Sequence, residues 1–142
     1  KTRISGVDVT NDINPDIETD YSLDAREFLK EYDEAEVDGG VLLDPPYSPR
    51  QVSECYKQHG YEVTMETTQS TFYTKIREEI ARICSEGAEV VTCGWNSTGI
   101  GKELDFEKEE ILLVCHGGAH NDTIVVRESY NPPPEQSGLG GF

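Results

Sequence analysis

The sequence of 142 residues predicts one α/β domain built around a mostly parallel sheet with an antiparallel hairpin at one edge. Two observations favour this fold class. Short apolar runs typical of buried strands alternate with amphipathic stretches typical of helices, as in parallel sheets. Near the end of the chain, two strand-like runs are joined by a short polar segment, which indicates a closing hairpin.

The composition is that of a folded protein without a membrane span. Hydrophobic residues make up 35% of the chain, which also contains seven tyrosines. No apolar run approaches the ~20 residues of a span, and the N-terminus lacks the apolar segment of a signal peptide. The cysteines are scattered and form no Cys-x-x-Cys pair, which indicates free thiols in a reducing compartment. We therefore expect a cytoplasmic protein. The cysteines are Cys55, Cys84, Cys93 and Cys115.

The net charge of −16 is unfavourable for a nucleic-acid partner, because phosphate contacts usually supply most of the affinity. The charge is unevenly distributed. Residues 8–44 contain thirteen acidic and two basic residues, whereas residues 50–82 contain five of each. An acidic surface also suits a salt-adapted protein, where screening is strong. The charge therefore weakens the case for a nucleic-acid partner without removing it.

The N-terminal region is expected to contain a strand and a helix. Residues 7–10 alternate apolar and polar side chains, as in a strand. Asp12 and Asn14 follow, where acidic residues either hold ribose hydroxyls, as in nucleotide-binding folds, or form an Asx turn. Residues 26–32 are amphipathic, and Asp24 fits the N-cap of that helix.

A second strand is predicted at residues 41–43, buried on both faces, and it stops at Asp44-Pro45-Pro46-Tyr47. Two prolines remove two N–H donors and fix φ, so neither a strand nor a helix can continue through them. The stiff turn would present the Asp44 carboxylate and the Pro45 carbonyl as acceptors for an exocyclic amino group. The Tyr47 ring would stack on the heterocycle that carries this group. An ordinary Pro-Pro loop with a surface tyrosine is the alternative.

The next part of the chain is predicted to form two helices and a strand. Ser48-Pro49 is a typical helix start for residues 50–57. Residues 71–84 place Phe72, Ile76, Ile80 and Ile83 at helical spacing, and core packing is the preferred interpretation of this face. Residues 88–93 form a strand, followed by a Gly-rich loop that contains Trp95, the only tryptophan, and Asn96. In a doubly wound sheet this loop falls on the same edge as the Asp-Pro-Pro-Tyr turn.

The closing hairpin is predicted at residues 106–115 and 123–127. The connecting loop contains two histidines and an aspartate. They do not provide three ligands at the spacing of a metal-binding motif, so we expect no metal site. The loop instead helps to shape a pocket, or simply turns. Residues 129–142, rich in proline and glycine, are expected to form a flexible tail beyond a domain of residues 1–128.

Asp44-Pro45-Pro46-Tyr47 resembles the catalytic motif of the S-adenosylmethionine-dependent DNA amino-methyltransferases, in particular the adenine-N6 group. The strand-then-acid segment, the Asp-Ala before a helix and this motif also follow the family's order. The resemblance covers roughly residues 7–127 and implies a Rossmann-like class I methyltransferase sheet. It also implies S-adenosylmethionine as the cofactor and DNA as the partner, with the target adenine flipped out.

The resemblance implies roles for individual residues. Asp44, Pro45, Pro46 and Tyr47 would be catalytic, without a covalent intermediate or a metal. The cofactor's ribose would be held by Asp12, with Asn14 beside it, and its adenine by Asp24 and Ala25. Substrate contacts are expected from Arg50, Trp95 and Asn96, although a solvated first helical turn, which includes Gln51, and a Gly-rich turn with a packed tryptophan are the alternatives.

The family's Gly-containing turn after its first strand is absent before Val7, and we expect upstream residues to supply it. Two rival functions remain. The same chemistry could act on cytosine-N4, an RNA base or a protein glutamine, because any planar amine or amide fits the turn. Alternatively, the chain could be a non-catalytic binding module that has lost the cofactor loop.

Overall fold

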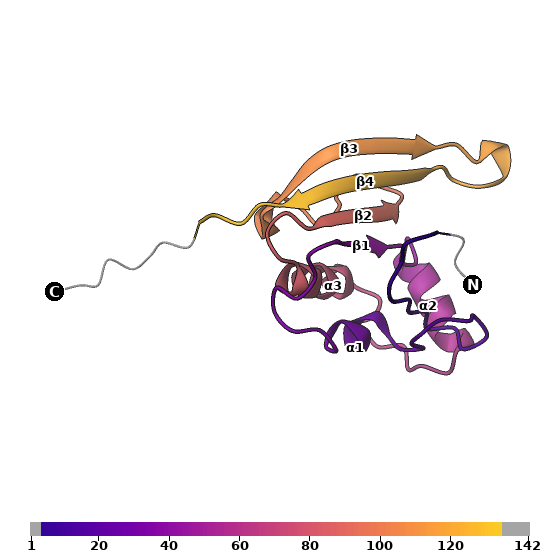
Figure 1. Ribbon diagram of the computed structural model, residues 1–142. Helices are drawn as coiled ribbons and strands as arrows, with labels where there is room; N and C mark the ends of the chain where they lie inside the picture. The colour runs from indigo at the N-terminus through magenta and orange to yellow at the C-terminus, as the bar shows by residue number, and fades with distance from the viewer. Residues whose placement is uncertain (1–3, 135–142) are drawn as a thin grey trace.

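A computed structural model describes residues 4–134, which form a four-stranded sheet with helices on one of its faces (Figure 1). The strands are β1 (Gly40–Leu43), β2 (Glu89–Gly94), β3 (Phe106–Val114) and β4 (Thr123–Tyr130). The helices are α1 (Ala25–Leu29), α2 (Pro49–Gln58) and α3 (Ser70–Ile83), with two short 3₁₀ turns, η1 (Lys102–Leu104) and η2 (Gly117–Ala119).

The sheet is mixed, with strand order β1-β2-β4-β3. β1 pairs with β2 in parallel, whereas β2 with β4 and β4 with β3 are antiparallel. The expectation of a mostly parallel sheet is therefore wrong for the described residues, while the hairpin at one edge is confirmed. The reason lies in the connections. Between residues 4 and 134 only one strand-helix-strand crossover occurs, from β1 to β2, and β4 of the hairpin takes part in both antiparallel pairs.

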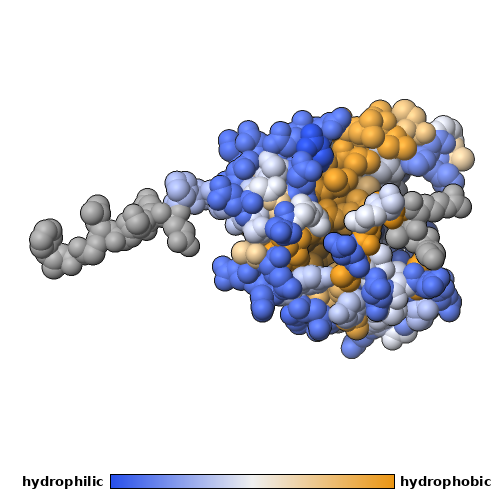
Figure 2. All heavy atoms as spheres, viewed as in Figure 1, coloured by the Kyte–Doolittle hydropathy of each residue, from blue (hydrophilic) through white to orange (hydrophobic). Residues whose placement is uncertain are grey.

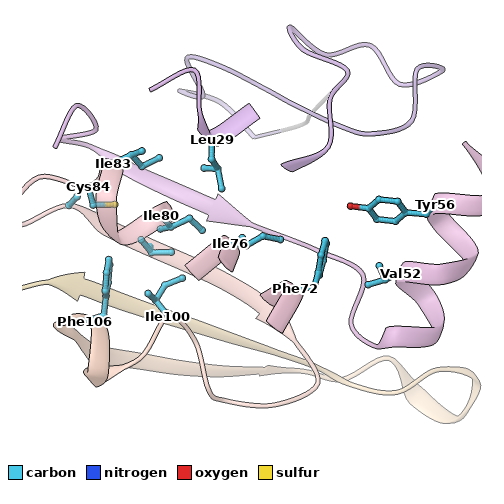
Figure 3. Packing of buried hydrophobic residues seen from close by; sticks show 12 residues of the cluster. Leu29, Val52, Tyr56, Phe72, Ile76, Ile80, Ile83, Cys84, Ile100 and Phe106 are labelled. Carbon is cyan, nitrogen blue, oxygen red and sulfur yellow. The ribbon is translucent and has the colours of Figure 1, made fainter. Parts of the chain in front are cut away.

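The core lies between α3 and the sheet (Figure 3). The predicted face of this helix is confirmed, because Phe72, Ile76, Ile80 and Ile83 are all buried. Each fully buried side chain of this size contributes about 1.5–3 kcal/mol, so this stripe is the main attachment of α3 to the sheet. Across the core they face Ala88, Val90, Ile100 and Phe106.

The strand expected at residues 7–10 is wrong. No strand forms there, and Val7 and Val9 stay exposed because no neighbouring strand pairs with them. Local side-chain bonds take over instead. Asp20 accepts hydrogen bonds from the Thr10 backbone N–H (2.8 Å) and hydroxyl (2.7 Å), so alternation without a pairing partner yields a loop.

β1 is also less enclosed than expected. Its residues alternate between exposed and half-buried, and Leu42 is 49% exposed. The prediction of burial on both faces is wrong because helices cover only one face of the sheet and β1 lies at its edge (Figure 1). The parallel pairing of β1 with β2 nevertheless places the end of both strands at one edge, which positions the turn after Leu43.

β4 continues two residues beyond the expected domain boundary at residue 128. Tyr130 ends the strand, donates its N–H to the Ala88 carbonyl (2.9 Å) and packs its ring 4.9 Å from that of Phe106. The tail predicted to begin at residue 129 is therefore partly strand, and its residues 135–142 lie outside the described residues.

Within the described part of the chain, no helix combines the length and apolar character that crossing a membrane would require.

Candidate active site

The Asp-Pro-Pro-Tyr turn directly follows β1 and is held on both sides by hydrogen bonds. The Gln51 side chain in α2 accepts the Tyr47 N–H (2.7 Å), and Ser48 caps the same helix. The Tyr73 hydroxyl in α3 donates to the Pro46 carbonyl (2.6 Å). Within residues 4–134 the Pro45 carbonyl accepts no hydrogen bond, which matches the expectation of an unbonded carbonyl at this turn.

The two polar groups of the motif meet each other. The Tyr47 hydroxyl donates to Oδ1 of Asp44 (2.7 Å) in an exposed contact. Burial, followed by the hydrogen bond to this carboxylate, raises the pKa of Tyr47 to about 12. Tyr47 therefore stays protonated at neutral pH and keeps its hydroxyl as a donor that fixes the orientation of the carboxylate.

Tyr47 and Trp95 form an edge-to-face pair, with ring centroids 5.8 Å apart and planes at 72°. This pair brings together two predicted site residues that are far apart in the sequence, because β1 and β2 are parallel neighbours. A T-shaped pair of this kind is a favoured aromatic geometry. It leaves ring surface available to a flat ligand, since Trp95 remains 39% exposed.

The aromatic pair separates two hollows. The larger, of about 680 Å³, opens between Tyr47, Gln51, Trp95 and the loop after β3, where His116, His120 and Thr123 contribute to its wall. The smaller, of about 280 Å³, lies on the α3 side of the turn, and both prolines, Tyr73, Arg77 and Asn96 line it. The expectation that the loop after β3 shapes a pocket is thus consistent with its position.

Glu128, a residue that the sequence analysis missed, holds the loop that carries Trp95 by hydrogen bonds from β4. This carboxylate is fully buried on β4 and accepts the N–H groups of Ile100 (2.6 Å) and Gly101 (3.1 Å). Gly99 has a φ of +64°, and a Cβ there would overlap the carboxylate. A glutamate within the alternating pattern of β4 was the available signal, because a charged residue on the inward face must have partners.

Asp24 is enclosed rather than open. It is 5% exposed and caps α1 by accepting the Arg26 N–H (2.8 Å). The Arg26 guanidinium also donates to both carboxylate oxygens, and the Tyr56 hydroxyl donates to Oδ2. Burial acts to raise the pKa of Asp24, but the hydrogen bonds from Arg26 and Tyr56 outweigh it and hold the pKa below its usual range. The N-cap interpretation is confirmed, and a cofactor role stays a prediction.

The other residues predicted to hold the cofactor lie in the N-terminal region. Oδ1 of Asp12 accepts the Asn14 N–H (2.8 Å), and the Asn14 side chain in turn accepts the Asp16 N–H (2.9 Å). The Asx turn is therefore confirmed, and it leaves the ribose role untested. Burial first, and then the charge of Asp12, raises the pKa of the Cys55 thiol in α2. Ala25 is the half-buried first residue of α1.

The predicted substrate residues differ in placement. Trp95 lines both hollows, and Asn96 lines the smaller one while its side chain accepts the Thr98 N–H (2.9 Å). Arg50 lines neither of them. Its side chain is 87% exposed and pairs with Glu54 (2.8 Å), as expected of a solvated first helical turn. Its neighbour Gln51, by contrast, reaches the turn.

No protein-family model matches this chain, and no curated protein sequence does. Among solved structures, the chain is similar to a candidate DNA modification methylase from Thermus thermophilus. Its crystal structures with and without S-adenosyl-L-methionine, and that of its selenomethionine derivative, each give 16% identity and a TM-score of 0.48. The matches cover 78% of this chain, which spans 51–52% of the matched chains, about half of their length.

Proposed function

We propose that this chain contributes to methyl transfer from S-adenosylmethionine to the exocyclic N6 amino group of adenine in DNA. The observation that carries the proposal is the geometry of the Asp44-Pro45-Pro46-Tyr47 turn at the end of β1. The turn carries an exposed carboxylate that accepts the Tyr47 hydroxyl, a carbonyl that accepts no hydrogen bond within residues 4–134, and an aromatic ring that lines both hollows.

The chemistry assigned to the chain's own residues is orientation. The Asp44 carboxylate and the Pro45 carbonyl accept the two N–H groups of the target amine, which localises its lone pair and directs it away from the turn. The Tyr47 hydroxyl holds Oδ1 of Asp44 in place. The flipped base enters where the two hollows meet, at Tyr47 and Trp95, and stacks against this aromatic pair, with Pro45 on the side of the smaller hollow. Positioning and electrostatics supply the acceleration.

S-adenosylmethionine would supply an electrophilic methyl group on a sulfonium. The matched bacterial methylase was crystallised with this molecule. For this chain we propose Asp12 and Asn14 at the ribose and Asp24 with Ala25 at the adenine, on the strength of the family resemblance. The structure adds one requirement. Because Arg26 and Tyr56 occupy the Asp24 carboxylate, they would have to release it before it could bind a ligand.

The test measures the transfer of radiolabelled methyl groups to adenine-containing duplex DNA, followed by digestion to identify the methylated base. We expect N6-methyladenine from the wild-type chain and a loss of roughly a hundredfold or more in Asp44→Ala. Asp38→Ala is the matched control, because it removes an exposed carboxylate that precedes β1, at the opposite end of this strand from the turn.

Each contrary outcome points to a different part of the proposal. A folded chain that binds S-adenosylmethionine but methylates only RNA, protein or cytosine would show that adenine in DNA is not the methyl acceptor. A folded chain that does not bind it by calorimetry would show that these 142 residues cannot catalyse without the Gly-containing turn expected upstream, whereas unchanged binding by Asp12→Ala would contradict the ribose assignment. Asp12→Ala is the sharper binding variant, since Asp24→Ala also removes the cap of α1.

A further inference from the structure

The outer strand of the hairpin has an unusually apolar second half. Residues 111–114 of β3 are Ile111, Leu112, Leu113 and Val114, which are 57%, 56%, 56% and 36% exposed. Successive residues in a strand point to opposite faces, so apolar side chains are exposed on both faces of the sheet here. Figure 2 shows apolar surface gathered over the end of the sheet where β3 approaches its turn.

The backbone of this segment is equally open. The strand order places β3 at the edge of the sheet, with β4 as its only partner strand among the described residues. One side of β3 therefore presents unpaired N–H and C=O groups. Edge strands of this kind are templates for pairing with another strand.

The two halves of β3 are protected differently. The first half carries four charged residues in succession and a break in register between Lys108 and Glu110. Charged side chains and bulges are the devices by which natural proteins block edge pairing. The second half has neither, and its pairing with β4 is regular from Ile111 to Val114. Protection thus stops where the apolar segment begins.

We propose that residues 110–114 of β3 pair antiparallel with the same segment of a second copy of this chain, joining the two sheets into one continuous sheet. The segment is self-complementary under two-fold symmetry. With the axis at Leu112, this residue meets its own copy, and Ile111 meets Leu113. Apolar cross-strand pairs then form on both faces.

The same register keeps the acidic residues apart. Glu110 lies opposite Val114 of the second copy rather than opposite another carboxylate. The remaining obstacle is the general repulsion between two chains of net charge −16, which salt screens over a Debye length of roughly 8–10 Å at 0.10–0.15 M. Association through this edge therefore strengthens as salt is added, whereas association through ion pairs would weaken.

Sedimentation equilibrium over a range of protein and salt concentrations tests the proposal. We expect the apparent mass of the wild-type chain to rise from that of one chain toward that of two, more readily at high salt. Leu112→Lys should remain a monomer under the same conditions, because it places two ammonium groups opposite each other. Met65→Lys is the matched control, since Met65 is 77% exposed in the loop before α3, and it should associate like the wild type.

Circular dichroism of each variant establishes that it is folded, and amide hydrogen exchange locates the contact. Amides of residues 111–114 should exchange more slowly as the wild-type concentration rises. A folded wild-type chain that stays monomeric throughout would overturn the proposal and leave the edge to a strand of another protein. Unchanged dimerisation of folded Leu112→Lys would overturn it as well.

Discussion

Two aspartates in this chain each accept a hydrogen bond from a tyrosine hydroxyl, in very different surroundings. Asp24 pairs with Tyr56 beneath the surface and also binds the backbone and guanidinium of Arg26. Asp44 pairs with Tyr47 at an exposed turn. The first carboxylate is surrounded by donors, whereas the second meets one donor beside a hollow.

This difference distinguishes a carboxylate that stabilises the fold from one that is free to bind a ligand. The bonds of Asp24 tie the start of α1 to α2, and the Arg26 guanidinium lies 5.2 Å from the Phe72 ring centroid. Removing this carboxylate would leave buried donors unpaired. The Asp44 carboxylate can exchange its solvent for a ligand at little cost to the fold. Similar pairs can therefore stabilise a fold or serve a site, depending on burial.

Substitution of the two aspartates should give the largest contrast. We expect Asp24→Ala to lower the free energy of unfolding by about 3 kcal/mol, a figure that allows for the partial exposure of Arg26. Asp44→Ala should lower it by less than about 1 kcal/mol. Urea unfolding followed by circular dichroism measures both. Equal losses in the two variants would show that the turn is as structural as the cap.

The tyrosine partners should repeat the contrast on a smaller scale. Tyr56→Phe removes a buried donor and should cost about 1–2 kcal/mol, since one oxygen of Asp24 loses a partner. Tyr47→Phe removes a donor from an exposed carboxylate, which water can replace, and should cost less than about 0.5 kcal/mol. The same unfolding experiment compares them. A larger loss for Tyr47→Phe would contradict the comparison.

Asp24 should make part of the protein's stability depend on pH in the acid range. Its folded pKa is held below the ordinary value of 3.8, so the protein gains stability from it above that pH and loses this gain as the pH falls further, through the folded pKa. In Asp24→Asn this part of the acid dependence should disappear. Unfolding free energies measured at a series of acidic pH values would show it. Identical slopes for the variant and the wild type would assign the acid sensitivity to other carboxylates.

At alkaline pH, ionisation of Tyr47 should have the smallest of the expected effects on the stability of the protein. Because its folded pKa is raised from 10.0 to about 12, its contribution is complete below pH 10 and is lost as the pH rises through about 12. Ultraviolet absorbance of the phenolate follows the ionisation directly. The difference between wild type and Tyr47→Phe should titrate near pH 12. A titration at the ordinary tyrosine pKa of 10.0 would mean that Tyr47 is neither buried as described nor paired with Asp44 in solution.

Much of the fold could be predicted from local patterns. The start of α2 at Pro49, the buried face of α3 and the hairpin depend on nearby residues, and the structure agrees to within a few positions. The prediction of a strand at residues 7–10 was wrong because a strand needs a partner, which alternation alone does not reveal. The excess of antiparallel pairing depends on how few crossovers occur between residues 4 and 134, and the order of elements along the chain does not fix this number.

The candidate site was also predictable where it depends on local patterns in the sequence. The motif identifies Asp44 and Tyr47 directly, and the parallel order of β1 and β2 brings Trp95 beside them. Glu128, which anchors the Trp95 loop, lies 28 positions after Ile100 and 27 after Gly101 in the sequence. This contact can be recognised only once β4 is placed in the sheet. The enclosure of Asp24 by Tyr56 is likewise a long-range contact, because the two residues are 32 positions apart.

The position of the single tryptophan has an optical consequence. Trp95 is the only indole in the chain, and its ring lies against Tyr47 at the wall shared by the two hollows. Its fluorescence therefore originates at one known place. A flat molecule that enters either hollow must change the polarity or quenching around this ring, so the emission of the unlabelled chain reports occupancy of the site. The fluorescence of Trp95 can therefore be used to rank candidate ligands by titration, even where no product is formed.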